Sequence, residues 1–116
     1  MHNWNQTAPI YQQLADRLAV QLLDGDPPEG EAMPSVRALA SRYLINPLTV
    51  SRAIQALTER DLVESRRGMG IYVKPGAREK LLHSEREQFL QEEWPALRER
   101  LARLGIAAKD LNWESQ

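Results

Sequence analysis

Hydrophobic side chains recur at steps of three and four along the first quarter of the chain, a spacing that places them on one face of a helix. The pattern predicts a helix over residues 9–23, with Thr7 as its N-cap and Pro9 in its first turn. Two prolines and two glycines within residues 24–30 cannot continue this helix, so the chain is expected to turn there. The apolar or small positions of the helix are Ile10, Tyr11, Leu14, Ala15, Leu18, Ala19 and Leu22.

Two shorter helices are predicted next, because each has a capping residue directly before a helical pattern. Ser35 is expected to cap the second helix, and Asn46 followed by Pro47 is expected to begin the third. A turn of three residues between them predicts a helix-turn-helix. The buried side of the second helix is Val36, Leu39, Ala40 and Tyr43, and that of the third is Val50, Ala53, Ile54 and Leu57. The outward positions of the third helix are Leu48, Thr49, Ser51, Arg52 and Gln55.

A short β-hairpin is predicted directly after the third helix. Residues 62–64 and 71–73 are expected to form its strands, and residues 66–70 are too many for a two-residue turn, so the tip should be a looser loop. The tip carries two arginines and two glycines. Such a hairpin after a helix-turn-helix predicts a winged helix-turn-helix over residues 1–75, a mostly α fold with a small β-wing.

Residues 76–116 are expected to form a helical dimerisation tail, because leucine and charged residues dominate them. Pro95 should kink or break the long helix near residues 92–94, since an internal proline costs about 3 kcal/mol. Gly105 should end it, with a short helix to follow. The apolar side chains of the tail, here called the tail seam, are Leu82, Phe89, Leu90, Trp94, Leu97, Leu101 and Leu104. One helix cannot hide this seam alone, so we expect a homodimer; the alternative is that the tail packs on the first helix of its own chain.

The net charge of −1 argues against a nucleic-acid partner, but its distribution does not. Residues 34–76 carry seven basic against three acidic side chains, a local charge of +4, whereas residues 1–33 carry −4 and residues 77–116 carry −1. Positive charge therefore concentrates in the segment already expected to hold the wing and the helix-turn-helix, as double-stranded DNA would require.

Other compositional features exclude several classes of protein. The absence of cysteine rules out disulfides, and with only two histidines we expect no metal site and no cofactor. Neither a glycine-rich phosphate loop nor a paired nucleophile and base is present, so we expect no enzyme. Without an apolar run of membrane-spanning length or the layout of a signal peptide, we expect no membrane partner and a cytoplasmic location.

The third helix supplies the candidate groups for reading bases. The Arg52 guanidinium matches a guanine edge or a phosphate, and the Gln55 amide can pair with adenine. Short hydroxyl donors at Thr49 and Ser51 suit close approach to the DNA backbone. Only apolar contact, for example with a thymine methyl, is available to Pro47 and Leu48.

The second helix and the wing supply further candidates. Ser35 and Arg37 lie at the start of the second helix, where Arg37 is placed for a phosphate or a flanking base. Arg66 and Arg67 are expected to bind phosphates or enter the minor groove, and Gly68 lets the backbone come close. Taken singly, an arginine on an amphipathic helix is usually only solvated, and a glycine in a hairpin usually serves the turn. The combination of the elements carries the prediction.

The same segments resemble the amino-terminal domain of GntR-type bacterial transcription regulators. The matching stretches cover over half of the chain: residues 9–14, 34–40, 49–57 and 67–73. The version over residues 46–53, with a carboxy-terminal segment of only about 40 residues, is similar to the YtrA subgroup, whose short helical tail serves dimerisation. The resemblance implies DNA contact by Arg37, by residues 49–52, and by Arg67 with Gly68.

One departure from the family pattern concerns base recognition. Many GntR-type proteins have arginine at the positions that Pro47 and Ser51 occupy here, so base reading would shift to Arg52 and Gln55. We therefore expect a transcription regulator that binds an inverted-repeat operator as a homodimer. A repressor is expected from the resemblance alone. The alternative is a winged-helix module for protein interaction, without specific DNA binding. A small-molecule effector, if one exists, would bind between the tail and the winged domain or across the dimer.

Overall fold

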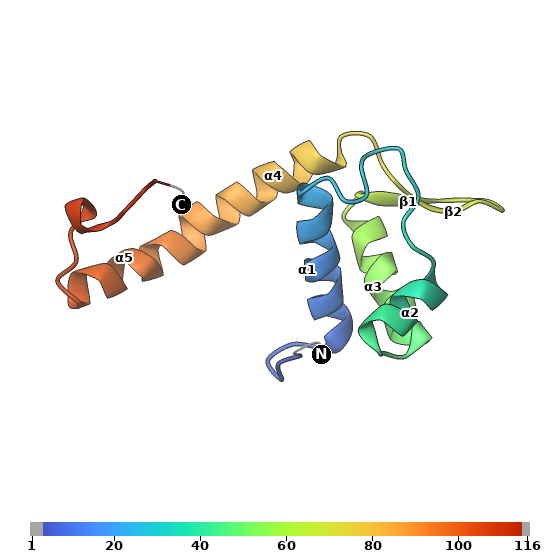
Figure 1. The fold of residues 1–116 in the computed structure, drawn as a ribbon, viewed down its shortest axis with the longest axis horizontal. Coiled ribbons are helices and arrows are strands. Elements are labelled where there is room, and N and C mark those ends of the chain that lie inside the picture. Colours follow the sequence, from blue (N-terminus) through green and yellow to red (C-terminus); the bar gives the residue numbers. More distant parts are fainter. Residues whose placement is uncertain (1–3, 115–116) are drawn as a thin grey trace. The chain divides into compact units, whose positions relative to one another are not determined.

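The structure, a computed structural model, describes residues 4–114 and is mostly helical with one two-stranded sheet (Figure 1). Its contacts divide the chain between Leu82 and His83 into two compact units. The predicted fold class, mostly α with a small β-wing, is confirmed.

Three helices build the core of the first unit: α1 (Ile10–Leu23), α2 (Val36–Tyr43) and α3 (Pro47–Glu59). α3 packs against both α1 and α2. Their buried faces match the positions expected from the hydrophobic spacing, except that Ile10 is exposed and Tyr11 and Val36 are only partly buried. The buried helical residues are Leu14, Ala15, Leu18, Ala19, Leu22, Leu39, Ala40, Tyr43, Val50, Ala53, Ile54 and Leu57.

The capping predictions hold for two of the three helices. The Ser35 hydroxyl accepts the backbone N–H of Ala38 at 3.0 Å, and the Asn46 side chain accepts that of Leu48 at 2.7 Å. The prediction that Thr7 caps α1 is wrong: the N-cap is Pro9, without a side-chain cap. Thr7 lies too far before the helix, and its hydroxyl donates to the Asn5 side chain instead.

The wing consists of β1 (Val63–Arg66) and β2 (Gly70–Val73), paired antiparallel so that Arg66 lies opposite Gly70. Both strands reach closer to the tip than predicted, and the connection is three residues long. It is also tighter than the expected loose loop, because the N–H of Met69 donates to the carbonyl of Arg66 at 2.8 Å. Gly68 makes this turn possible, since its φ of +75° lies in the region that favours glycine.

A third segment accompanies the wing on its other side. The N–H of Met33 donates to the carbonyl of Ile71, and the N–H of Val73 donates to that of Glu31. β2 therefore lies between β1 and residues 30–33, which lead directly into α2. This pairing fixes the wing relative to the start of the helix-turn-helix.

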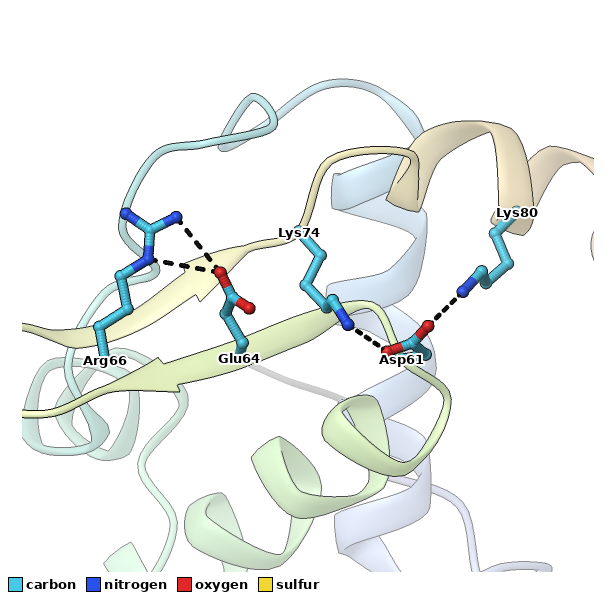
Figure 2. A network of polar contacts seen from close by, with 5 residues as sticks. All are labelled: Asp61, Glu64, Arg66, Lys74 and Lys80. Atoms are coloured by element: carbon cyan, nitrogen blue, oxygen red, sulfur yellow. Dashed lines mark hydrogen bonds and ion pairs between the residues drawn. The ribbon is translucent and has the colours of Figure 1, made fainter.

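The compact unit extends past the expected domain boundary at residue 75, because Ala77 and Leu81 of helix α4 (Ala77–Gln88) are buried in its core. Asp61, which follows α3, accepts hydrogen bonds from Lys74 and from Lys80 of α4 (Figure 2). The two ammonium groups lower the pKa of Asp61 to about 2.

A second carboxylate holds the beginning of α4. Glu29 accepts the backbone N–H groups of Gly76 at 2.9 Å and Arg78 at 3.0 Å, and these hydrogen bonds lower the pKa of Glu29. The Arg78 side chain in turn donates to the carbonyl of Leu23. The loop after α1 is thereby attached to the first turn of α4.

Beyond α4, the tail continues as a π-helical turn, η1 (Phe89–Glu93), and helix α5 (Trp94–Arg103). In this turn the N–H of Trp94 donates to the carbonyl of Phe89, five residues earlier. Pro95 gives the physical reason, because its ring has no N–H and would clash with the carbonyl four residues before it in a regular α-helix. A last 3₁₀ turn, η2, spans Ala108–Asp110.

Within residues 4–114, no helix is long and apolar enough to cross a membrane. The same residues contain no cluster of three or more histidine, cysteine or carboxylate side chains that could hold a metal ion.

Candidate nucleic-acid interface

The outward face of α3 combines apolar and polar side chains. Four of these side chains follow one another at steps of three, one and three residues, a spacing that places them in one stripe along the helix. The stripe lies opposite the buried Val50, Ala53 and Leu57. Pro47 begins the helix and is also exposed, while Thr49 is partly buried beside the stripe. The residues of this stripe, here called the reading stripe, are Leu48, Ser51, Arg52 and Gln55, and all four are exposed.

Arg52 of the reading stripe stacks on an aromatic ring. Its guanidinium carbon lies 4.2 Å from the ring centroid of Tyr11, the second residue of α1. The two residues, with Gln55, Ala56 and Glu59, line a hollow of about 170 Å³. In the described part of the chain the Arg52 side chain has no hydrogen bond or ion pair, so its N–H donors are available to a ligand.

The start of α2 presents one engaged and one open group. Ser35 is exposed, and its oxygen accepts the Ala38 N–H as the helix cap, while its O–H remains a donor that a phosphate oxygen could accept. Arg37, in the first turn of α2, is exposed. Of these two predicted contacts, Arg37 is the better placed to bind a phosphate.

The two wing arginines differ in their surroundings. Arg66, in β1, pairs with Glu64 at 3.3 Å (Figure 2). Its guanidinium carbon also lies 4.1 Å from the ring centroid of Tyr72. Arg67, at the tip beside Gly68, is exposed. The sequence presented the two arginines as equivalent, whereas the structure leaves only Arg67 without a competing carboxylate among the described residues.

Sequence reasoning missed three residues that shape this surface: Tyr11, Tyr72 and Glu64. Hydrophobic spacing places Tyr11 on the apolar face of α1, because spacing alone does not separate a core tyrosine from one at the rim of the core. Glu64 and Tyr72 lie opposite each other in the wing, so the strand register brings both to Arg66. An alternation of side chains along β1 was available in the sequence and would have placed Glu64 and Arg66 on one face.

The tail seam presents apolar side chains at its surface. Exposed fractions are 39% for Leu82, 55% for Leu90 and 60% for Leu104, while Trp94 and Leu101 are partly buried. Phe89 and Leu97 share a hollow of about 390 Å³ with Glu93, Ala96 and Arg100.

The arrangement defines the class of the molecule: a helix-turn-helix with an exposed stripe on its second helix, followed by a β-wing, as in transcription regulators. A family model described as "Bacterial regulatory proteins, gntR family" matches residues 10–73. Since this is more than half of the chain, the protein belongs to the GntR family of bacterial regulatory proteins.

Two curated relatives illustrate the similarity. The chain is 34% identical over 79 residues to the HTH-type transcriptional repressor YtrA of Bacillus subtilis (strain 168), covering 68% of this chain and 61% of YtrA. It is 38% identical over 66 residues to the mannosyl-D-glycerate transport/metabolism system repressor MngR of Escherichia coli (strain K12), covering 57% of this chain and 28% of MngR. The matched region thus spans less than two thirds of either relative, and both relatives are named as repressors.

Solved structures confirm the winged fold with a helical carboxy-terminal region. A transcriptional regulator from Oenococcus oeni superposes with a TM-score of 0.73 at 25% identity, over 94% of this chain and 89% of that chain. YtrA from Sulfolobus acidocaldarius, a GntR-family transcription factor, superposes with a TM-score of 0.59 at 27% identity, over 76% of this chain and 93% of that chain. Within its family the chain is therefore YtrA-like, as its sequence motifs indicated.

Proposed function

We propose that the protein binds an inverted-repeat operator in double-stranded DNA as a homodimer and represses transcription there. The observation that carries the proposal is the reading stripe of α3, where polar and apolar side chains stay exposed directly opposite a fully buried face. A helix with one exposed face and one buried face can enter the major groove without disturbing the core.

The neighbouring elements support phosphate contacts around that helix. Arg37 is exposed at the start of α2 and Arg67 is exposed at the wing, and residues 34–76 carry the local charge of +4. In this proposal Arg52 and Gln55 read bases, Pro47 and Leu48 give apolar contact, and Thr49, Ser51 and Ser35 approach the backbone. Arg66, Arg67 and Gly68 bind beside them in the minor groove or at phosphates.

Pairing is expected because one winged helix reads only a few base pairs, whereas specific regulators bind DNA with affinities of about 10⁻⁸ M or tighter. Linking two such modules raises their effective concentration at a two-fold symmetric site. We assign the tail seam to this contact, with a second copy of the chain as its occupant. The repressor role is proposed because YtrA of Bacillus subtilis and MngR of Escherichia coli carry that name.

Selection of duplexes from a random library by the full-length protein, followed by salt titration of the selected sequence, tests the DNA-binding proposal. We expect an inverted repeat and an affinity that falls steeply with salt. Arg52→Ala should cost about 1–3 kcal/mol on the selected duplex and relax discrimination at one or two bases. Arg60→Ala is the matched control, because Arg60 is an exposed arginine at the far end of α3.

Three outcomes would contradict parts of this assignment. Absence of any salt-sensitive complex would favour the protein-interaction role of a winged helix. Equal losses for Arg52→Ala on selected and random duplexes would mean that Arg52 contacts only phosphate. A reporter gene under the selected operator should be silenced by the protein, and increased transcription would replace the repressor with an activator.

A further inference from the structure

The contact between Tyr11 and Arg52 joins a residue of α1 to the centre of the reading stripe. Tyr11 is partly buried and packs against the core, so α1 fixes the position of its ring. The Arg52 guanidinium carbon lies 4.2 Å from the centroid of that ring, a distance at which the cation and the π electrons attract each other. The tyrosine hydroxyl makes a separate contact, accepting the Gln12 amide at 3.3 Å.

The contact with Tyr11 leaves the N–H donors of Arg52 available for hydrogen bonds to a base. A cation over a ring face is attracted by the π electrons, and in the described residues no acceptor takes the N–H donors of Arg52. The contrast with Arg66 is direct. Arg66 also lies over a tyrosine, Tyr72, but Glu64 occupies its Nε and one of its terminal nitrogens.

An unrestrained arginine side chain samples many rotamers. Fixing it in one rotamer on a ligand loses conformational entropy, and this loss opposes binding. A guanidinium already held over a ring loses less of that freedom when it meets a base edge, and the fixed ring also determines which base step it reaches. Gln55 lines the same hollow, so the position of Arg52 also limits the space in which Gln55 can move.

We infer that Tyr11 is a positioning residue for base recognition: its ring holds the Arg52 guanidinium ordered for the base edge, without itself contacting DNA. The inference rests on the proposed function, in which Arg52 reads a base. It adds a determinant of operator specificity that lies outside the helix-turn-helix, in α1.

The test compares two substitutions in the full-length protein on the duplex selected by the wild type and on random duplex. Tyr11→Phe keeps the ring and removes only the hydroxyl, whereas Tyr11→Leu keeps apolar packing and removes the ring. We expect Tyr11→Leu to weaken binding to the selected duplex about three- to fivefold and to relax discrimination at the bases that depend on Arg52, with little change on random duplex. Tyr11→Phe should remain within about twofold of the wild type.

A double-mutant cycle separates positioning from general destabilisation. In an Arg52→Ala background, Tyr11→Leu should cause no further loss, because the residue through which it acts is absent. Loss of the same size in both backgrounds, equal losses on selected and random duplexes, or equal weakness of the Phe and Leu variants would each overturn the inference. Thermal unfolding of every variant shows whether the fold is retained, and Tyr11→Phe provides the comparison if Tyr11→Leu unfolds.

Different results would contradict the proposed DNA-binding function and the positioning role of Tyr11. A wild-type protein that selects no sequence and forms no salt-sensitive complex would overturn the proposed function and the inference together. A wild type that selects an operator, combined with independent effects of Tyr11→Leu and Arg52→Ala, would overturn the inference alone.

Discussion

Lys80 in α4 donates a hydrogen bond from its Nζ to Asp61 at 2.6 Å, across 19 residues of sequence. Asp61 follows α3, the helix proposed to enter the major groove. The pair therefore joins the end of α3 to α4, whose first turns belong to the first compact unit, here called the winged unit (Figure 2). Lys74 shares the same carboxylate. One exposed aspartate therefore links α3, the end of the wing and α4.

The first prediction concerns pH. The pKa of Asp61 is lowered from 3.8 to about 2 in the folded chain, so its pairing stabilises the fold fully above about pH 4 and is lost as pH falls through about 2. Asp61→Asn should reduce the midpoint of thermal unfolding at pH 7, and the difference from wild type should shrink between pH 4 and pH 2. Asparagine is the appropriate replacement because Asp61 has a φ of +65°, which asparagine tolerates.

The matched control is Asp16→Asn, since Asp16 is an exposed aspartate of α1 without an ion pair in the described residues. It should leave the midpoint nearly unchanged at every pH. A difference between wild type and Asp61→Asn that stays constant from pH 7 to pH 2 would contradict the electrostatic account.

The second prediction concerns backbone strain in the turn of the helix-turn-helix. Leu44 follows α2 with a φ of +57°, in the left-handed region, and its side chain is 81% exposed. Leu44→Gly should raise the free energy of unfolding by about 0.5–1 kcal/mol, because relief of the left-handed strain exceeds the added entropy of the unfolded glycine. Urea denaturation measures this change.

The same substitution within a helix should have the opposite sign. Leu48 is similarly exposed but lies in the first turn of α3, where Leu48→Gly should lower the free energy of unfolding by up to about 1 kcal/mol. If both variants were destabilised alike, the strain at Leu44 would not be the relevant difference between the two sites.

The third prediction separates the wing arginines. Glu64 competes with phosphate for Arg66, so Glu64→Gln should tighten binding to random duplex about two- to fivefold and steepen its salt dependence. Arg67→Ala should weaken binding and reduce the salt slope by about one, since Arg67 has no competing partner among the described residues. Fluorescence anisotropy at several salt concentrations gives both quantities.

Glu99→Gln serves as the control for the change in net charge, because Glu99 is exposed in α5, outside the winged unit. Binding that tightens equally with Glu99→Gln would mean that Glu64 acts only through the overall charge of the protein. An Arg66→Ala variant as damaging as Arg67→Ala would mean that the Glu64 pairing yields completely to DNA.

The helices and their buried faces were predictable because hydrophobic spacing and capping residues act locally. Ser35 and Asn46 marked the beginnings of α2 and α3, and glycine and proline marked the breaks. The partners of the arginines were not predictable in this way. Tyr11 meets Arg52 through the packing of α1 on α3, and Glu29 meets Gly76 across 47 residues, so both contacts depend on tertiary structure. The same holds for Ala77 and Leu81, whose burial extends the winged unit into α4.

The fourth prediction concerns the homodimer. Leu97 is 45% exposed and shares its hollow with Phe89, so a charged side chain at position 97 would replace an apolar contact and would have to lose its water if a second copy covers this face. Leu97→Asp should convert the dimer to a monomer at micromolar concentration and weaken operator binding by at least about tenfold, because the two winged units then bind separately. Sedimentation equilibrium and anisotropy measure the two effects.

Lys109→Asp is the control, an exposed position in η2 outside the tail seam, and should leave the dimer intact. A wild type that sediments as a monomer and still binds an inverted repeat tightly would contradict the pairing role of the tail. A monomeric wild type whose fold is destabilised by Leu97→Asp would instead indicate that the tail seam packs on its own winged unit. Because each winged unit retains Arg52 in the Leu97→Asp variant, its affinity for a single half-site should equal that of the wild type.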